Sequence, residues 1–289
     1  MFIAARIGRS IFPVLAVALA VAVPQRPVPA AQTGHVILAP YRAVYRLQLA
    51  RTRGIRNIDA VGGRILIDLS GSACEGYAQQ FQQIIELQSV EGQNHFNDVR
   101  SATWEDGKAR NFSFHTVTSH DGNRTDTVDG HAERGAKSVT VSLSKPRRQT
   151  FGEPADVVFP IEQIRRIVEA ARAGRRFITL AVYDGSQTGR KLYKTLTVIG
   201  RAISPGRRPP DDAAAKVPAM RQLTRWPVTV SYYDGNAHQG QGGELTPVYI
   251  TGFELYENGI ARALWFKDSN MIVSGKLTSL AMEKTAPCH

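Results

Sequence analysis

The chain has 289 residues, with 43% hydrophobic and 21% charged residues, a formal net charge of +11 and two cysteines. This composition excludes a disordered chain, a collagen-like repeat and a small scaffold stapled by disulfides. The length allows one large domain or two ordinary ones, and either can bury most of its apolar surface without a metal. After residue 30 no stretch approaches the ~18 consecutive apolar residues of a membrane span, so we expect the mature chain to be soluble.

Residues 1–30 have the pattern of an export signal. Arg6 and Arg9 precede an apolar run over residues 11–23, and a small-residue cleavage site of the A-x-A type follows at residues 28–30. A membrane anchor is the alternative, but the run is shorter than the ~20 residues that a spanning helix needs. We therefore expect cleavage of residues 1–30, which leaves residues 31–289 as one β-rich periplasmic domain.

Strand and turn patterns dominate the rest of the chain. Apolar and polar residues alternate in residues 41–49, 65–69, 139–143 and 249–255, as in strands with one buried face. Asp-Gly and Asn-Gly pairs, which favour hairpin turns, begin at Asp106, Asp121, Asp129, Asp184, Asp234 and Asn258. We predict a mainly β fold, a single unit of about a dozen antiparallel strands.

One segment departs from this pattern and predicts an amphipathic helix near residues 160–173. Pro160 occupies a typical first helical position, and Gly174 can end the helix. Apolar residues at helical spacing are Ile161, Ile164, Ile167, Val168 and Ala171. The opposite face carries Glu162, Arg165, Arg166, Glu169 and Arg172. We expect the apolar face to lie on the sheet and the charged face to be solvated; contact with an anionic surface is the alternative.

Residues 204–217 are rich in proline and arginine and predict a long exposed loop. The two cysteines, Cys74 and Cys288, stand near the two ends of the expected mature chain. Export to an oxidising compartment favours a disulfide between them, which would tie the end of the chain to its beginning; two free thiols are the alternative.

The spacings that several catalytic and metal sites require are missing. Ser186 directly follows a glycine and so does not fit the G-x-S-x-G nucleophile elbow, and no phosphate-binding glycine loop is present. His115 and His120 would point to opposite faces of a strand, and the remaining histidines include the scattered His95, His131 and His238. Asp121, Asn123 and Thr125 faintly resemble a calcium loop, but Asp126 replaces the required glycine, which favours a hairpin turn. We expect no catalytic residue, cofactor or metal site.

The excess of lysine and arginine allows an anionic partner, such as lipid headgroups at a membrane surface. Because these residues are spread along the chain, an inert basic surface is the alternative. Export argues against nucleic acid as a partner.

Five segments together match a known family: residues 38–45 (LAPYRAVY), 74–77 (CEGY), 183–186 (YDGS) followed by Lys191 and Tyr193, 225–232 (RWPVTVSY) and 253–260 (FELYENGI). In them the chain resembles the EipB family of periplasmic cell-envelope integrity proteins. The resemblance implies antiparallel strands wound into a β-spiral, a disulfide between Cys74 and Cys288, and a role in keeping the envelope intact. The resemblance implies no catalytic residue. Residues 266–270 depart from the family pattern and leave only a local hairpin in doubt.

Three functions are therefore considered. The first is a non-enzymatic, monomeric periplasmic protein that supports envelope integrity by binding an envelope component or a partner protein. The second is a carrier or sensor of a lipid-like envelope component, since a curved sheet can enclose an apolar groove. The third, an envelope hydrolase, is disfavoured by the missing catalytic spacings.

Overall fold

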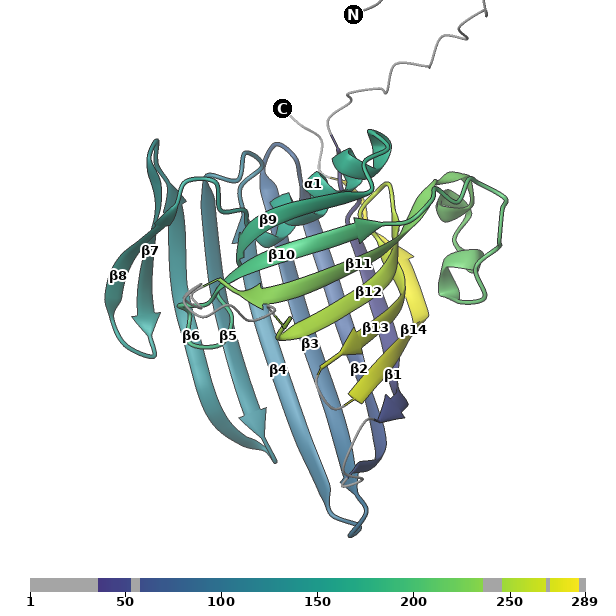
Figure 1. Ribbon diagram of the computed structural model, residues 1–289, viewed down its shortest axis with the longest axis horizontal. Coiled ribbons are helices and arrows are strands. Elements are labelled where there is room, and N and C mark those ends of the chain that lie inside the picture. The colour runs from purple at the N-terminus through teal and green to yellow at the C-terminus, as the bar shows by residue number, and fades with distance from the viewer. Residues whose placement is uncertain (1–35, 53–57, 236–245, 269–270, 286–289) are drawn as a thin grey trace, which may run out of the picture. The chain divides into compact units, whose positions relative to one another are not determined.

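The computed structural model describes residues 36–52, 58–235, 246–268 and 271–285 (Figure 1). The predicted signal peptide of residues 1–30 lies outside the described residues. Within the described part of the chain, one 14-stranded sheet and one α-helix account for most of the structure, which confirms the mainly β prediction with its single α-helix. No helix in these ranges is long and apolar enough to cross a membrane.

The first half of the sheet comprises β1 (Tyr41–Thr52), β2 (Ile58–Ser72), β3 (Gly76–Ser89), β4 (Asn94–Glu105), β5 (Asn111–His120), β6 (Asn123–Arg134), β7 (Ser138–Lys145) and β8 (Gln149–Pro154). Helix α1 (Pro160–Arg172) precedes β9 (Phe177–Tyr183), β10 (Leu192–Ile199), the 3-10 helices η1 (Ala213–Lys216) and η2 (Pro218–Gln222), β11 (Arg225–Asp234), β12 (Tyr249–Tyr256), β13 (Ala261–Lys267) and β14 (Met271–Met282). The antiparallel order runs from β8 through β1 to β14 and on to β9. The first and last strands therefore pair in the middle of the sheet.

Several strands bury one face, as the alternating sequence predicts, most clearly β1, β7 and β10. In β1 the side chains of Tyr41, Ala43 and Tyr45 are buried, whereas Arg42 between them is exposed. The predicted turns at residues 106, 121, 184 and 258 connect consecutive strands, and the pair at residue 234 ends β11. The predicted turn at Asp129 is wrong, because this pair lies within β6. Gly130 is needed there for close packing: a Cβ would lie 2.7 Å from the Ser142 carbonyl oxygen of β7.

The sheet curls until regions near its two edges meet. Phe114 of β5 and Val141 of β7 share one buried cluster with Tyr183 of the opposite edge strand β9. The ring centroids of Phe114 and Tyr183 are 5.8 Å apart. Val158, which precedes α1, also bridges Val182 of β9 in parallel. In Figure 1 this curl appears as β9–β12 crossing in front of β3 and β4, which agrees with the predicted spiral winding.

Helix α1 lies inside the curl, where Ile167 and Val168 belong to the main buried cluster. Its N-terminus is held by the Glu105 carboxyl group at the end of β4, whose two oxygens accept hydrogen bonds from the backbone N–H groups of Ile161 and Glu162, both 2.8 Å. Such bonds satisfy donors that have no partner within a helix. The prediction of a solvated charged face is wrong for Arg165, which is buried and donates to the Gly107 carbonyl oxygen at 2.7 Å.

The prediction of an exposed loop over residues 204–217 holds only for its first part. Residues 204–209 are exposed, but Asp212 and Ala214 are buried. The Arg262 guanidinium of β13 donates to Asp212 at 2.7 Å, and Asp212 also caps η1 through a hydrogen bond from the Ala214 N–H group. The buried ion pair fastens the second part of this segment to the sheet.

Glu105 should make the stability of the fold depend on pH. Burial raises its pKa to about 8, against the opposing effects of the helix N–H groups and Arg165. Between pH ~5 and ~8 the folded chain then holds a proton that the unfolded chain releases, so the free energy of unfolding should fall by a few kcal/mol as the pH rises. Urea unfolding of the parent and of Glu105→Gln across this range measures the effect.

The Glu105→Gln variant lacks the titrating group, so its free energy of unfolding should depend much less on pH. Glu133→Gln, at an exposed position of β6, is the matched control and should keep the pH dependence of the parent. Equal pH dependence of the parent and Glu105→Gln would contradict the assignment.

Candidate functional site

The outward face of β1–β8 carries a long depression, which we call the outer groove. It consists of two adjoining cavities of about 800 and 820 Å³ that share Gln80, Ala102 and His115. The first is lined by residues that include Arg42, Asp68, Gln82, Phe96, Asp98, Arg100, Val117 and Arg124. The second is lined by residues that include Ala78, Trp104, Ser113, Asp129, His131, Ser142, Arg148 and Thr150.

The outer groove arises from small side chains at aligned positions of neighbouring strands. Pairing places Trp104 opposite Ser113, Ser113 opposite His131, and His131 opposite Ser142. A second row runs from Gln80 through Ala102 to His115. Alanine and serine in these rows leave room above the sheet, while larger side chains stand on either side.

Charged side chains of both signs stand in the lining among exposed apolar groups. Arg42 and Asp68 form an ion pair at 2.8 Å, as do Arg100 and Asp98. Exposed pairs of this kind contribute little to stability, so they remain available to a ligand. Two aromatic side chains stand exposed on the same face, Phe96 at 45% and Trp104 at 39%. Exposed rings beside hydrogen-bonding groups are typical of a surface that binds a partner.

Two histidines come together in the outer groove, although the sequence suggested that they were scattered. His131 lies on the strand next to His115, and the His115 Nδ1 atom is 2.9 Å from the Asp129 carboxylate. Hydrogen bonds from Ser144 and then His115 lower the pKa of Asp129. His238 lies outside the described residues. Among those described, no three His, Cys, Asp or Glu side chains form a group that could hold a metal ion.

The segment with a faint resemblance to a calcium loop is a hairpin turn between β5 and β6, as predicted. The Asp121 carboxylate accepts a hydrogen bond from the Phe96 N–H group at 2.7 Å and lies 3.2 Å from His95. These contacts tie the turn to the neighbouring hairpin. The Phe96 N–H bond, followed by the bond to His95, lowers the pKa of Asp121.

Tyrosine rings pack around the connection that contains Ser186. The Ser186 N–H group donates to the Asp184 carboxylate at 2.9 Å, and burial raises the pKa of Asp184. Tyr193 packs edge-on against Tyr232 and Tyr249, with ring centroids 5.7 Å apart in each case. Sequence analysis missed this cluster because its members come from three strands.

A smaller cavity of about 290 Å³ lies on the inward face, and we call it the inner pocket. Apolar side chains from both halves of the sheet line it, including Ile85, Leu87, Phe266, Met271 and Val273. The Asn97 side chain also lines it, and its Oδ1 atom is buried without a hydrogen-bond partner among the described residues.

Comparison with known proteins assigns the chain to a family. The EipB-like family matches residues 32–284. The chain belongs to the EipB-like family. A curated relative, the "Cell envelope integrity protein EipB" of Brucella abortus (strain 2308), is 30% identical over 250 residues, which is 86% of each protein. A crystal structure of a beta-barrel-like protein of a domain of unknown function, also from Brucella abortus, matches with a TM-score of 0.77 and 28% identity over 86% of this chain and 99% of that one.

Within this EipB-like fold, Cys74 lies exposed in the turn between β2 and β3, and Cys288 lies outside the described residues. Their pairing stays a prediction. Strand register favours it, because Met282 at the end of β14 pairs with Tyr41, which pairs in turn with Leu69 near the end of β2. The C-terminal segment therefore leaves the sheet at the same end as the turn that holds Cys74.

We predict that Cys74→Ser lowers the melting temperature without abolishing the fold. The loop-entropy model gives on the order of 5 kcal/mol for so long a closed loop, an upper value because denatured chains keep residual structure. The variant should also accumulate to a lower level in an oxidising compartment, because proteases remove destabilised chains. Thermal melting and steady-state amounts measure both effects.

A double-mutant comparison makes this test sharper. Cys74→Ser, Cys288→Ser and the double variant should be equally destabilised, because each removes the same bridge. Non-reducing peptide mapping should find the linked pair. Additive losses, or free thiols in the native protein, would rule the bridge out.

Proposed function

We propose that this member of the EipB-like family is an exported, monomeric and non-enzymatic periplasmic protein that supports cell-envelope integrity. Binding of an envelope component or partner protein along the outer groove is the proposed mode of action. The name of the Brucella abortus relative, a cell envelope integrity protein, supports the envelope role. The family is likewise not named for an enzymatic activity.

The observation that carries the proposal is the continuity of the outer groove. Two cavities of about 800 and 820 Å³ meet at Gln80, Ala102 and His115, so one elongated ligand could occupy both. Each volume lies within the ~300–1,000 Å³ of typical ligand sites. Exposed aromatic rings, apolar lining and charges of both signs suit an elongated partner that has both apolar and charged parts.

We predict that Ala102→Trp, which fills the junction of the two cavities, abolishes function but not folding. Ala102 lies on the outward face, so the variant should change the free energy of unfolding by less than ~1 kcal/mol. A strain that lacks the native protein should stay sensitive to detergent when it carries Ala102→Trp. Thermal melting of the purified variant is measured alongside.

Ala219→Trp, at an exposed position of η2, is the matched control and should restore resistance fully. If a folded Ala102→Trp protein restores resistance as well as the parent does, the outer groove is not the functional site.

A second candidate function is the carriage or sensing of a lipid-like envelope component, and the inner pocket favours it. At about 290 Å³ this pocket lies at the small end of ligand sites, so it would accept one acyl chain rather than a whole lipid. Mass spectrometry of organic extracts of the protein purified from its native compartment should then detect a stoichiometric amphiphile. Extracts free of any amphiphile would discard this function.

The envelope hydrolase remains the least supported alternative. Neither the family nor the curated relative is named for catalysis, and the sequence around Ser186 lacks the nucleophile-elbow spacing. A screen of hydrolysis of peptidoglycan and esters, with outer-groove variants as comparison, tests it directly.

A further inference from the structure

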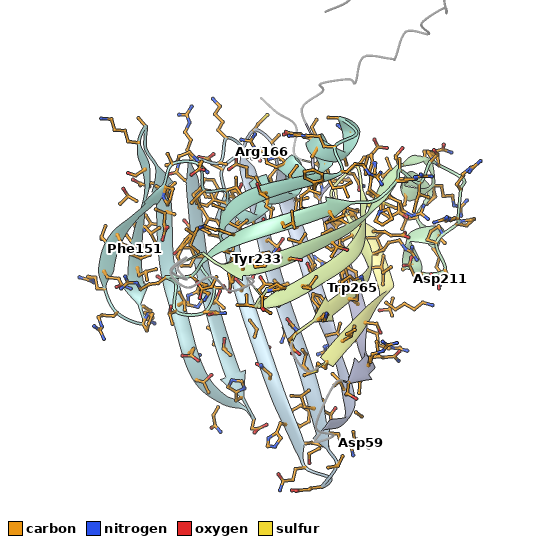
Figure 2. The ribbon with its side chains drawn as sticks, viewed as in Figure 1. Asp59, Phe151, Arg166, Asp211, Tyr233 and Trp265 are labelled. Carbon is orange, nitrogen blue, oxygen red and sulfur yellow. The ribbon has the colours of Figure 1, made fainter. Side chains whose placement is uncertain are left out.

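The outward face of β9–β13 differs in character from the outer groove. Strand register aligns one row of residues straight across five strands: Phe177, Val198, Thr229, Gly252 and Trp265. The next row consists of Thr179, Leu196, Ser231, Ile250 and Lys267. Neither row contains a carboxylate. Figure 2 labels Tyr233 and Trp265 on this part of the sheet.

Large apolar side chains stand exposed at the β9 end of these rows. Phe177 is 69% exposed, Val198 51% and Leu196 36%. Phe177 and Val198 are directly opposed, and Leu196 is two residues before Val198 on the same face. We call these three residues the apolar patch. Most large apolar side chains of a folded protein are buried, so a contiguous exposed apolar patch of this kind marks an interaction site.

Cations border the apolar patch. Arg175 and Arg176 directly precede Phe177, Lys194 lies two residues before Leu196, and Arg201 follows β10; all four are exposed. Among the described residues none of these four side chains forms an ion pair.

Negative charge is scarce around the apolar patch. Residues 174–203 contain six Lys and Arg and one acid, Asp184, which lies beyond the opposite end of β9 from Phe177. Glu254 lies on β12, which β11 separates from the patch strands, and its carboxylate is already bound by Arg225 at 2.7 Å and Arg262 at 2.5 Å. The surface around the apolar patch is therefore positive.

We propose that this face docks on the surface of a membrane that contains anionic phospholipids, with Phe177 inserted among the headgroups. Exposed aromatic and aliphatic side chains ringed by arginine and lysine are the combination that interfacial membrane binding uses. Each cation close to an anionic leaflet strengthens binding by roughly fivefold. A protein partner would need carboxylates to match the cations; the lipid surface supplies phosphates along with an apolar layer.

The inference is independent of the outer groove, which lies on other strands. Membrane docking would place the protein at the envelope surface and leave the outer groove to bind its own partner. Loss of vesicle binding in apolar-patch variants therefore leaves the prediction for Ala102→Trp untouched.

Vesicle flotation of the purified full chain tests the proposal. Vesicles of phosphatidylethanolamine with about 30 mol% phosphatidylglycerol are compared with vesicles of pure phosphatidylcholine. The parent should bind the anionic vesicles more strongly, and ~0.5 M salt should weaken that binding. Phe177→Ser should reduce the vesicle partition coefficient by roughly tenfold or more, and Arg175→Glu/Arg176→Glu by at least as much.

Two matched controls test whether the loss of vesicle binding is specific to the face of β9–β13. Val90→Ser removes an exposed apolar side chain (58%) from the turn between β3 and β4, and Lys145→Glu/Arg147→Glu reverses two exposed cations at the hairpin between β7 and β8; none of these residues lines the outer groove. Both should bind vesicles as the parent does. All variants share residues 1–35, so any contribution of that segment cancels, and thermal melting verifies that each is folded.

Three results would overturn the proposal. The first is equal binding of the parent to neutral and anionic vesicles. The second is equal loss in the control and apolar-patch variants. The third is binding to lipopolysaccharide micelles or soluble phosphate without binding to phospholipid vesicles.

Discussion

Burial of one face of a single long sheet against itself is the constraint on which the rest of this structure depends. An open sheet of 14 strands exposes its apolar face unless something covers it. Here the cover is the other half of the same sheet together with α1, because Phe112 and Phe114 of β5 meet Tyr183 of β9 in one cluster. The curl turns every second residue of the strands outward, and these residues form the surfaces available for binding.

Polar groups trapped inside the curl find partners across long sequence distances. Glu105 holds the N-terminus of α1, and Arg165 of the same helix bonds back to the turn after β4. Arg134 of β6 donates to the Ala155 carbonyl oxygen and to Glu162 of α1. Since unpaired buried polar groups are costly, these contacts restrict where α1 can sit.

The two outward faces suit different roles. The outer groove combines small side chains, paired charges and two exposed rings, whereas the face of β9–β13 combines exposed apolar residues with Arg175, Arg176, Lys194 and Arg201, which form no ion pair with any described residue. We propose that one chain in this way binds a ligand in the outer groove and approaches an anionic surface with the other face. The two faces lie apart because they belong to opposite halves of the curled sheet.

The sequence by itself determined the local features of the protein: alternating strands, most of the hairpin turns, a helix that begins at Pro160, and the segments that identify the family. These follow from period-two or helical burial and from turn chemistry, which act between near neighbours. Only the tertiary structure decided that Arg165 and Asp212 are buried, that Ala102 and His115 share a cavity, and that Phe177 aligns with Trp265. The reason is physical: burial and curl depend on contacts between segments far apart in the chain, and the alignment of residues across several strands accumulates the registers of successive strand pairs, which no single local pattern encodes.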